Sequence, residues 1–338
     1  MTKSFATARK TKVEQTSLLH PLDFHFNLFI RSKEVEGLKP RTISDHKIFY
    51  SYFRRWLSVY YPALTVDQLT ADIVRQYIHY MLTEQPLFDG HKQLAKFNDR
   101  QGLSPATVNI RTRSLKCFLK FLYDEGHLST NIAPRLKLQK VPIDTIGAFS
   151  KEEMLLLLSA PNQREFVGFR DYVLMVVLFD TGMRINEVLN MLAKDIDFIH
   201  KSIHIPATHS KNGQARTVPI TKRTCDLLST LLAENQEQFS QHPDHLFLAR
   251  DGKPMTYLAA YTRISHYGKQ VGITGTRVSP HTFRHTFATH YVSSGGNIFS
   301  LQKILGHSDM SMVRKYVQLT QSDLQKHHEK NSPLADLL

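Results

Sequence analysis

The segment SPHTFRHTFATHYVSSGG, residues 279–296, places two histidines and an arginine within five positions and then reaches a glycine pair. Ser279 and Pro280 are a typical helix start, because serine caps the first turn and proline needs no amide hydrogen bond there. His281 and Arg284 then share one face of the predicted helix. An imidazole beside a guanidinium suits a phosphate group, so this segment predicts half of an anion site.

The same segment has two competing interpretations. His281 and His285 have the four-residue spacing of a zinc helix, but Thr282 stands where a carboxylate is needed and Arg284 would put a fixed positive charge beside the metal. The sequence therefore predicts no metal site and no cofactor. A partly buried helix with polar residues of structural use is the second alternative, and His285 and His290 are assigned to it.

The composition predicts a globular protein. A chain of 338 residues with 41% hydrophobic content can form two domains with separate cores. Cys117 and Cys225 are its only cysteines and are far apart, which excludes a disulfide framework and favours a reducing compartment. The N-terminal stretch has no apolar segment typical of a signal peptide, so we expect a cytoplasmic, nucleoid-associated protein without membrane contact.

The basic charge of the chain is concentrated in its first part. The net charge is +13, and residues 1–140 carry 22 lysines and arginines against 12 acidic residues, whereas residues 141–338 carry 21 against 18. Such an asymmetry favours a polyanionic partner such as DNA or RNA over a simple role in solubility.

Three amphipathic helices are expected in a DNA-binding domain over residues 21–130, which follows an N-terminal arm over residues 1–20. The helices lie in GLKPRTISDHKIFYSYFRRWLSVYY with Thr42 as cap, in TADIVRQYIHYMLTEQ with Thr70 as cap, and after Ser104-Pro105 up to Gly126. Basic residues on the polar faces suggest contacts with a nucleic-acid backbone. The candidate DNA-binding residues are Thr42, Arg113, Lys116 and Lys120. The polar stretch 86–102 is longer than usual for a connection in a helical domain.

A linker over residues 131–149 is expected before the second domain, residues 150–320. Its first helix begins with a capping box, in which Ser150 is followed three residues later by Glu153. A longer apolar helix ends at Gly182. Residues 195–220 then alternate with period two and turn at Lys201-Ser202 and Asn212-Gly213, which predicts a three-stranded antiparallel sheet before helices resume at about Thr221.

Four segments of this second domain together resemble the sequence boxes of the tyrosine recombinases, the family of phage integrases and Xer-type recombinases. They are DTGMRINEVLNML at 180–192, HSKNGQARTVPI at 209–220, HTFRHTFATH at 281–290 and LGHSDMSMVRKY at 305–316. Each box alone is a weak signal. Their occurrence in the order and at the spacing of the family makes chance similarity very improbable, and it favours a site over a set of unrelated surface residues.

The resemblance implies a role for each matching residue. It implies Arg184 and Arg284 as the arginine pair, Tyr316 as nucleophile, Lys211 as the hairpin lysine, His281 and His307 as the two box histidines, and Glu187 as an acidic support near Arg184. The chemistry asks for these residue types: two guanidinium groups can stabilise the charge of a phosphoryl transition state without a metal. Tyrosine needs a base, for which His281 is the first choice, and Lys211 can protonate the leaving 5′ oxygen.

The family resemblance also implies an architecture and an assembly. The implied fold is mainly α with a small antiparallel sheet, in which a helical core-binding domain and a mixed α/β catalytic domain form a clamp around DNA. The implied partners are double-stranded DNA with paired inverted half-sites and three further copies in a tetramer on DNA, with a monomer or weak oligomer off DNA and possible accessory proteins. The C-terminal tail, residues 321–338, carries a leucine stripe that suggests docking in trans.

The implied reaction is site-specific recombination by way of a 3′-phosphotyrosyl intermediate and a Holliday junction, leading to integration, excision or resolution. Two alternatives remain from the residues alone. One is DNA relaxation by a type IB topoisomerase, which shares the chemistry but needs no pairing of sites. The other is a DNA-binding regulator without catalytic activity.

Overall fold

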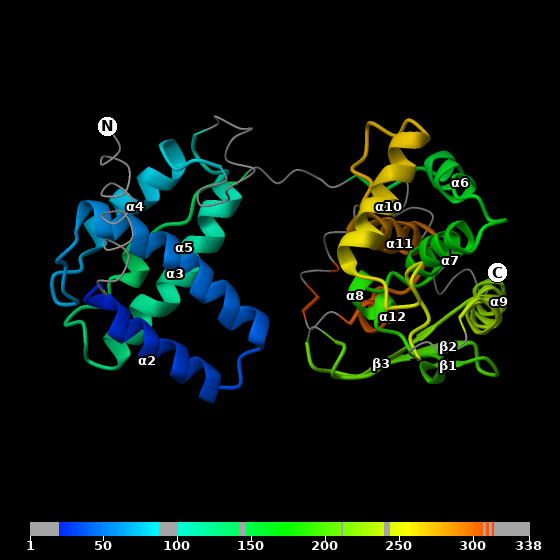
Figure 1. The fold of residues 1–338 in the computed structure, drawn as a ribbon, viewed down its shortest axis with the longest axis horizontal. Coiled ribbons are helices and arrows are strands. Elements are labelled where there is room, and N and C mark those ends of the chain that lie inside the picture. Colours follow the sequence, from blue (N-terminus) through cyan, green and yellow to red (C-terminus); the bar gives the residue numbers. More distant parts are fainter. Residues whose placement is uncertain are drawn as a thin grey trace, which may run out of the picture. The chain divides into compact units, whose positions relative to one another are not determined.

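The computed structural model describes residues 20–87, 101–141, 147–210, 212–239, 244–306, 309–310 and 313. The chain divides into two compact units, residues 1–143 and 144–338, each of which has its own hydrophobic core. Helices dominate both units, and one three-stranded antiparallel sheet lies in the second (Figure 1). The predicted fold class is confirmed. The clamp arrangement of the two units stays a prediction.

The N-terminal unit is a helical bundle. Its elements are α2 (Leu22–Val35), α3 (Pro40–Tyr60), α4 (Ala71–Thr83), α5 (Pro105–Asp124) and the short η2 (Ala133–Arg135). Helix α2 was not predicted from the sequence, although Leu22, Phe26 and Phe29 recur at helical spacing and are buried. It lacks a side-chain cap at Pro21, so the usual start signal is missing.

The helix starts of this unit test three of the predictions. Thr70 caps α4 by accepting the Ile73 amide at 3.4 Å, and Ser104 caps α5 by accepting the Thr107 amide at 3.3 Å, as predicted. Thr42 is not a cap: α3 begins at Pro40, so Thr42 lies in its first turn and donates its amide to the Lys39 carbonyl. Proline at the first helical position, with its backbone dihedral already fixed, explains the earlier start.

Aromatic side chains form one part of the N-terminal core. The rings of Phe26 and Tyr50 stack with centroids 3.7 Å apart, and Phe118 meets both edge to face. The Asp23 carboxylate is buried beside them, where it accepts from the Tyr50 hydroxyl at 2.9 Å and from Arg54 Nε at 3.1 Å. The core therefore joins α2, α3 and α5 through rings and through one paired charge.

The segment predicted as a linker contributes to both cores. Ile132, Ala133 and Leu136 are buried in the N-terminal core, and Phe149 is buried in the core of the second unit. Two hydrogen bonds attach the segment to the N-terminal unit as far as Gln139. The Asn109 side chain donates to the Gln139 carbonyl and accepts the Gln139 amide. The part of 131–149 outside both cores is therefore much shorter than its proline-rich sequence suggests.

The second unit is built around one buried helix, α7. Its helices are α6 (Lys151–Ser159), α7 (Phe166–Thr181), α8 (Ile185–Leu189), α9 (Lys222–Gln238), α10 (Tyr257–Gln270), α11 (Pro280–Ser293) and α12 (Ile298–Leu305), with the short η3 (Ala193–Asp195). Eleven of the 16 residues of α7 are buried, and this helix contacts α9 on one side and α11 on another (Figure 1). A helix that is apolar all round belongs in the interior.

Several local predictions for this unit are confirmed. Ser150 and Glu153 form the capping box of α6, with the Ser150 amide 2.9 Å from the glutamate and the Glu153 amide 3.2 Å from the serine hydroxyl. Gly182 ends α7 in the left-handed conformation, and Thr221 caps α9. These signals depend only on neighbouring residues, which is why the sequence suffices to locate them.

The sheet runs in the order β1 (Ile196–Asp197), β2 (Ser202–Ile205) and β3 (Arg216–Pro219), with antiparallel pairing throughout. Ile203 pairs with Val218, and both are fully buried in the core of the second unit. Lys201 enters β2 with a φ of 49°, and the Asp197 carboxylate accepts the amides of Ile199 and His200 in the preceding turn. Both predicted turns are confirmed.

No helix among the described residues combines the length and the apolar character needed to cross a bilayer.

Candidate active site

The site begins at the turn after α7. Gly182 has a φ of +60°, and a Cβ atom there would lie 2.3 Å from Phe287 and 2.9 Å from Leu305, so no other residue fits without displacement. The Thr181 hydroxyl accepts the Met183 amide at 3.2 Å and fixes the turn. The chain then enters α8 with Arg184 as its N-cap residue.

The Glu187 carboxylate holds Arg184 in place. It accepts from the Arg184 amide and from Arg184 Nη1, each at 2.9 Å. It also accepts from Arg216 Nη1 at 3.0 Å and from Arg216 Nη2 at 2.6 Å, and its side chain is only 1% exposed. Burial would raise the pKa of Glu187, but the hydrogen bonds and charges of Arg216 and Arg184 outweigh it and lower that pKa. Glu187 is therefore ionised at neutral pH.

Arg284 fastens the second part of the site. Ser279 caps α11 by accepting the Thr282 amide at 3.3 Å, as the sequence predicts, and Arg284 lies in the following turn with 4% exposure. Its guanidinium donates to the Gly182 carbonyl at 2.7 Å and to the Leu305 carbonyl at 2.8 Å. One side chain thus joins the turn that carries Arg184 to the end of α12.

His281 lies one helical turn before Arg284. The His281 side chain is exposed, but the groups packed around it remove part of its hydration and so lower its pKa, and the charges of Arg284 and Arg184 lower that pKa further. Both arginines therefore act on one imidazole, which is kept neutral at neutral pH and can accept a proton. Burial, followed by the neighbouring His281, also lowers the pKa of His285. Among the described residues, no group of three or more His, Cys, Asp or Glu is arranged to hold a metal ion.

Arg216 belongs to the site although the sequence analysis did not single it out. Besides its double bond to Glu187, it donates from Nε to the Ile304 carbonyl at 2.9 Å, and only 9% of its side chain is exposed. The available signal is the alternation of β3: Arg216 shares the inward face with Val218. A charge on an inward position requires a buried partner of opposite sign.

Three predicted catalytic residues, Lys211, His307 and Tyr316, lie outside the described residues. Asn212 follows Lys211 in the sequence, and Gly306 precedes His307. The Asn212 side chain donates to the Gly306 carbonyl at 3.1 Å. The hairpin between β2 and β3 therefore meets the end of α12 on the same side as Arg216.

The predicted DNA-binding residues differ in how the fold uses them. Lys116 Nζ donates to the Leu136 carbonyl at 2.9 Å, and Lys120 pairs with Asp124 at 2.6 Å, so both charges are partly engaged within the unit. Arg113 is exposed on α5, and Thr42 is exposed at the start of α3. Contact of these four residues with DNA stays a prediction.

Comparison with known proteins places this geometry in a family. The model of the phage integrase family matches residues 148–323. The tyrosine recombinase XerC of Myxococcus xanthus is 28% identical over 308 residues, covering 90% of this chain and 95% of the relative, and XerC of Chlamydia trachomatis is 28% identical over 275 residues, covering 81% and 80%.

Solved structures show the same fold. The Tn1549 transposon integrase in complex with a circular intermediate DNA aligns with a TM-score of 0.68 and 20% identity, over 90% of this chain and 99% of that one. A lambda integrase dimer bound to a core site aligns with a TM-score of 0.64 and 16% identity, over 86% and 96%.

The chain belongs to the phage integrase family, the tyrosine recombinases. It is a site-specific DNA recombinase and hence a DNA strand transferase; the topoisomerase and the inactive regulator are not favoured.

Replacing Arg216 by methionine should destabilise the second unit by about 2–4 kcal/mol at pH 7, because Glu187 keeps its buried charge and loses two of its hydrogen bonds. The lowered pKa of Glu187 means that its stabilising contribution is present above the unfolded-state pKa, near ~4.3, and is lost as pH falls through the folded-state pKa. Urea unfolding should therefore show a difference that shrinks in acid.

The matched control for this variant is Arg164→Met, which removes an exposed arginine of the same unit. It should change the unfolding free energy by less than about 0.5 kcal/mol. An Arg216→Met defect of equal size at pH 7 and at low pH would contradict an ionic role for Arg216.

Proposed function

We propose that this recombinase cuts and rejoins double-stranded DNA with Tyr316 as nucleophile, at paired inverted half-sites. The observation that carries the proposal is that Arg284, on the same helix as His281, donates to the Gly182 and Leu305 carbonyls and so joins α11 to the turn that carries Arg184. Such a group of fixed donors and one proton acceptor matches the needs of phosphoryl transfer to a hydroxyl.

The two arginines would bind the phosphate under attack. A phosphodiester attacked by an oxygen nucleophile gains negative charge on its non-bridging oxygens in the transition state. Arg284 is already aligned by two backbone carbonyls and Arg184 by Glu187, so little reorganisation is needed when that charge develops. The Arg184 side chain remains 24% exposed, which leaves it within reach of DNA.

The proton transfers follow from the remaining residues. His281 accepts the phenolic proton as the Tyr316 oxygen bonds to phosphorus, and the bond from phosphorus to the 5′ oxygen breaks. Lys211 donates a proton to that 5′ oxygen, and His307 hydrogen-bonds the phosphate. The product is a 3′-phosphotyrosyl link that conserves the energy of the broken bond, so rejoining through a Holliday junction needs no ATP and no cofactor.

The DNA partner is supported by relatives. The Tn1549 integrase was solved with a circular intermediate DNA and the lambda integrase with a core site. We assign DNA backbone contacts to the basic surface of the N-terminal unit, with Arg113 and Thr42 as first candidates and Lys116 and Lys120 as weaker ones. Accessory proteins and a cytoplasmic, nucleoid-associated location belong to the same proposal.

A tetramer on DNA would use the C-terminal tail. Its leucines Leu334, Leu337 and Leu338 form a small apolar stripe in the sequence. The second unit offers an apolar groove of about 760 Å³ between α6, α7, α9 and α11, in which Leu155 and Phe287 take part. We assign this groove to the tail of a neighbouring copy, in a cyclic arrangement that closes the tetramer.

Replacing Tyr316 by phenylalanine should abolish the covalent adduct while DNA affinity stays within a few-fold of the parent, because only the attacking hydroxyl is lost. A suicide substrate with a nicked strand traps the adduct, and denaturing gels measure it in a buffer that contains EDTA. An adduct that persists in the variant shows that another residue attacks. Parent protein that forms none would favour the inactive regulator.

Replacing Lys211 by alanine should slow cleavage of ordinary DNA about 100-fold, the usual effect of a positioned general acid. A substrate with a bridging 5′-phosphorothiolate has a leaving group that needs no proton, so its single-turnover cleavage should regain most of the lost rate. If the sulfur substrate is cleaved equally slowly, Lys211 binds phosphate and another group supplies the proton.

Deleting residues 332–338 should preserve binding of one protomer to a half-site and sharply reduce synapsis. Burial of three leucines contributes up to roughly 5 kcal/mol before the cost of ordering the tail, enough to matter for assembly on DNA. Native gels and light scattering of the protein with DNA measure both steps. Leu155→Asp, in the proposed acceptor groove, should give the same defect; tetramers of normal yield from either variant would contradict tail docking.

A further inference from the structure

The connection between α10 and α11 leads into the helical turn that carries His281. Ser279 ends this connection as the cap of α11. Two residues earlier, the Arg277 carbonyl accepts from the Thr282 hydroxyl at 2.6 Å. The backbone of Arg277 is therefore attached to the first turn of α11, the turn in which His281 lies, and its position relative to His281 is fixed in the free protein.

Helix α10 holds the same connection from another side. The Ser265 hydroxyl of α10 donates to the Val278 carbonyl at 3.2 Å. Gly268 lets the two segments approach closely, because a Cβ atom at this position would lie 2.4 Å from the Val278 side chain. Helix α10 also contacts α8, whose N-cap residue is Arg184. Arg277 is thus anchored to α11 and to a helix that contacts α8.

The Arg277 side chain is exposed and forms a cluster with two tyrosines of α10. Its Nη2 donates to the Tyr261 hydroxyl at 3.3 Å. The Tyr261 ring stacks with that of Tyr257, with centroids 6.1 Å apart and 19° between the planes. The hydrogen bond from Arg277 lowers the pKa of Tyr261, which makes its hydroxyl a stronger donor. Among the described residues, no carboxylate forms an ion pair with Arg277, so its charge is available to an anion.

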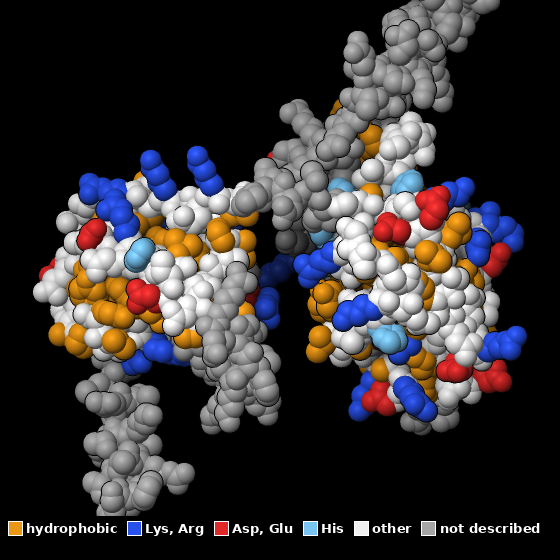
Figure 2. All heavy atoms as spheres, turned by 90° about the horizontal axis from the view of Figure 1, so that it is seen from above, with side chains coloured by type: hydrophobic (Ala, Val, Ile, Leu, Met, Phe, Trp, Pro, Cys, Tyr) orange, Lys and Arg blue, Asp and Glu red, His pale blue; other side chains and the backbone are white. Residues whose placement is uncertain are grey.

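The total charge of the second unit does not identify the surface that faces DNA. Residues 141–338 carry 21 Lys and Arg against 18 Asp and Glu. On the face that Figure 2 shows, the Lys and Arg side chains of this unit, at the right, are interspersed with Asp and Glu. Contact with DNA near the site therefore depends on individual cations that have a fixed position and no carboxylate partner. Within the part of the chain that the structure describes, Arg277 has both properties.

We propose that Arg277 and the Tyr261 hydroxyl bind the DNA phosphate directly next to the phosphate under attack. This assignment rests on the proposed function, in which Arg184 and Arg284 hold the phosphate under attack. Phosphates of one strand follow each other every ~3.4 Å of duplex axis, so an arginine attached to the first turn of α11 suits the neighbouring one.

Both groups of this pair can donate to one phosphate. A guanidinium binds phosphate oxygens through charge-assisted hydrogen bonds, and the Tyr261 hydroxyl keeps its own proton to donate while it accepts from Arg277. Phosphate contacts fix the register of a protein on the duplex. The pair therefore sets which phosphate of the strand reaches the two arginines of the candidate active site.

The salt dependence of binding tests the charge of Arg277. The probe is a half-site duplex that the full-length parent protein selects from a random DNA library. Arg277→Gln should weaken binding of the full chain about ten-fold, and the slope of log Kd against log salt should fall by about 1, the effect of losing one phosphate contact. Arg164→Gln, which removes an exposed arginine of the same unit, is the matched control and should leave the slope unchanged.

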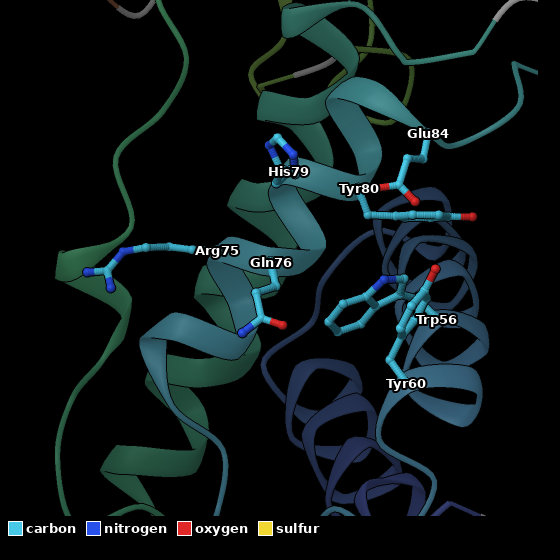
Figure 3. A pocket seen from close by; sticks show the side chains of 7 residues that line it. All are labelled: Trp56, Tyr60, Arg75, Gln76, His79, Tyr80 and Glu84. Atoms are coloured by element: carbon cyan, nitrogen blue, oxygen red, sulfur yellow. The ribbon is translucent and has the colours of Figure 1, made fainter.

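The fold of both variants can be checked without DNA. Trp56 is the only tryptophan of the chain, and it lines a pocket of the N-terminal unit with Tyr60 and Tyr80 (Figure 3). Its emission should be the same in both variants and in the parent, because the substitutions lie in the other unit. The thermal transition should also stay unchanged, since both arginine side chains are exposed.

Single methylphosphonates, each of which removes the charge of one phosphate, identify the contact. At the position bound by Arg277, the methylphosphonate should weaken binding of the parent about ten-fold and of Arg277→Gln by less than about two-fold, because the partner charge is already absent. The same scan with Arg184→Gln identifies the phosphate that Arg184 binds. The two positions should be consecutive on one strand. Tyr261→Phe should weaken binding a few-fold with an unchanged salt slope, because it removes no charge.

Three outcomes would overturn the proposal. A salt slope of Arg277→Gln equal to that of Arg164→Gln would leave Arg277 as a structural partner of Tyr261. Positions for Arg277 and Arg184 that are not consecutive would place Arg277 on another part of the duplex. A loss that follows an exchanged base pair and no methylphosphonate would make Arg277 a reader of bases. Because the scan measures binding and not cleavage, a missing adduct with Tyr316 would count against the proposed function alone.

Discussion

The Glu187 carboxylate is the point on which the site geometry depends. Its two oxygens connect three elements: the N-cap of α8 through Arg184, strand β3 through Arg216, and the end of α12 through the Arg216 bond to Ile304. A buried carboxylate needs several donors to remain charged, and here those donors belong to the segments that must be aligned. The hydrogen bonds that keep Glu187 charged are therefore the same ones that align these three segments.

Helix α7 supplies the support behind this ion pair. It is almost wholly buried, and it ends at Gly182, whose left-handed conformation turns the chain toward Arg184. The Gly182 carbonyl in turn accepts from Arg284 on α11. The hydrophobic core and the site thus meet at Gly182, where only glycine fits. A change in the packing around α7 would therefore displace both Arg184 and Arg284.

Much of this arrangement could be predicted from the sequence because the signals are local. The capping residues Thr70, Ser104 and Ser150, the start of a helix near Thr221 and the shared helix face of His281 and Arg284 need only neighbouring residues to be interpreted, whereas Arg184 was assigned through the resemblance to the family. Thr42 failed as a cap because Pro40, two residues earlier, competes for the helix start. Arg216 was missed because its function depends on Glu187, 29 residues away in sequence. The pattern of β3 indicates that the side chain points inward, but it does not indicate which residue the side chain pairs with.

The segment 131–149 is a second case in which partners distant in sequence decide the structure. Prolines and a glycine make it look like a connection, yet Leu136 and Phe149 are buried in different cores. Composition reports local backbone preferences, whereas burial is decided by tertiary partners. The Asn109 side chain that holds Gln139 has no pattern in sequence that would reveal it.

The manner in which Arg284 is held has a consequence for the resting protein. Two backbone carbonyls accept from its guanidinium and align it, while Arg184 and Arg216 share the Glu187 carboxylate. Among the described residues, two guanidinium groups thus share one carboxylate close to His281, which leaves this part of the site with an excess of positive charge. Because an entering anion would balance this charge, we expect the thermal stability of the second unit to rise with phosphate or sulfate in the solution, and the DNA backbone to act as a stabilising counterion.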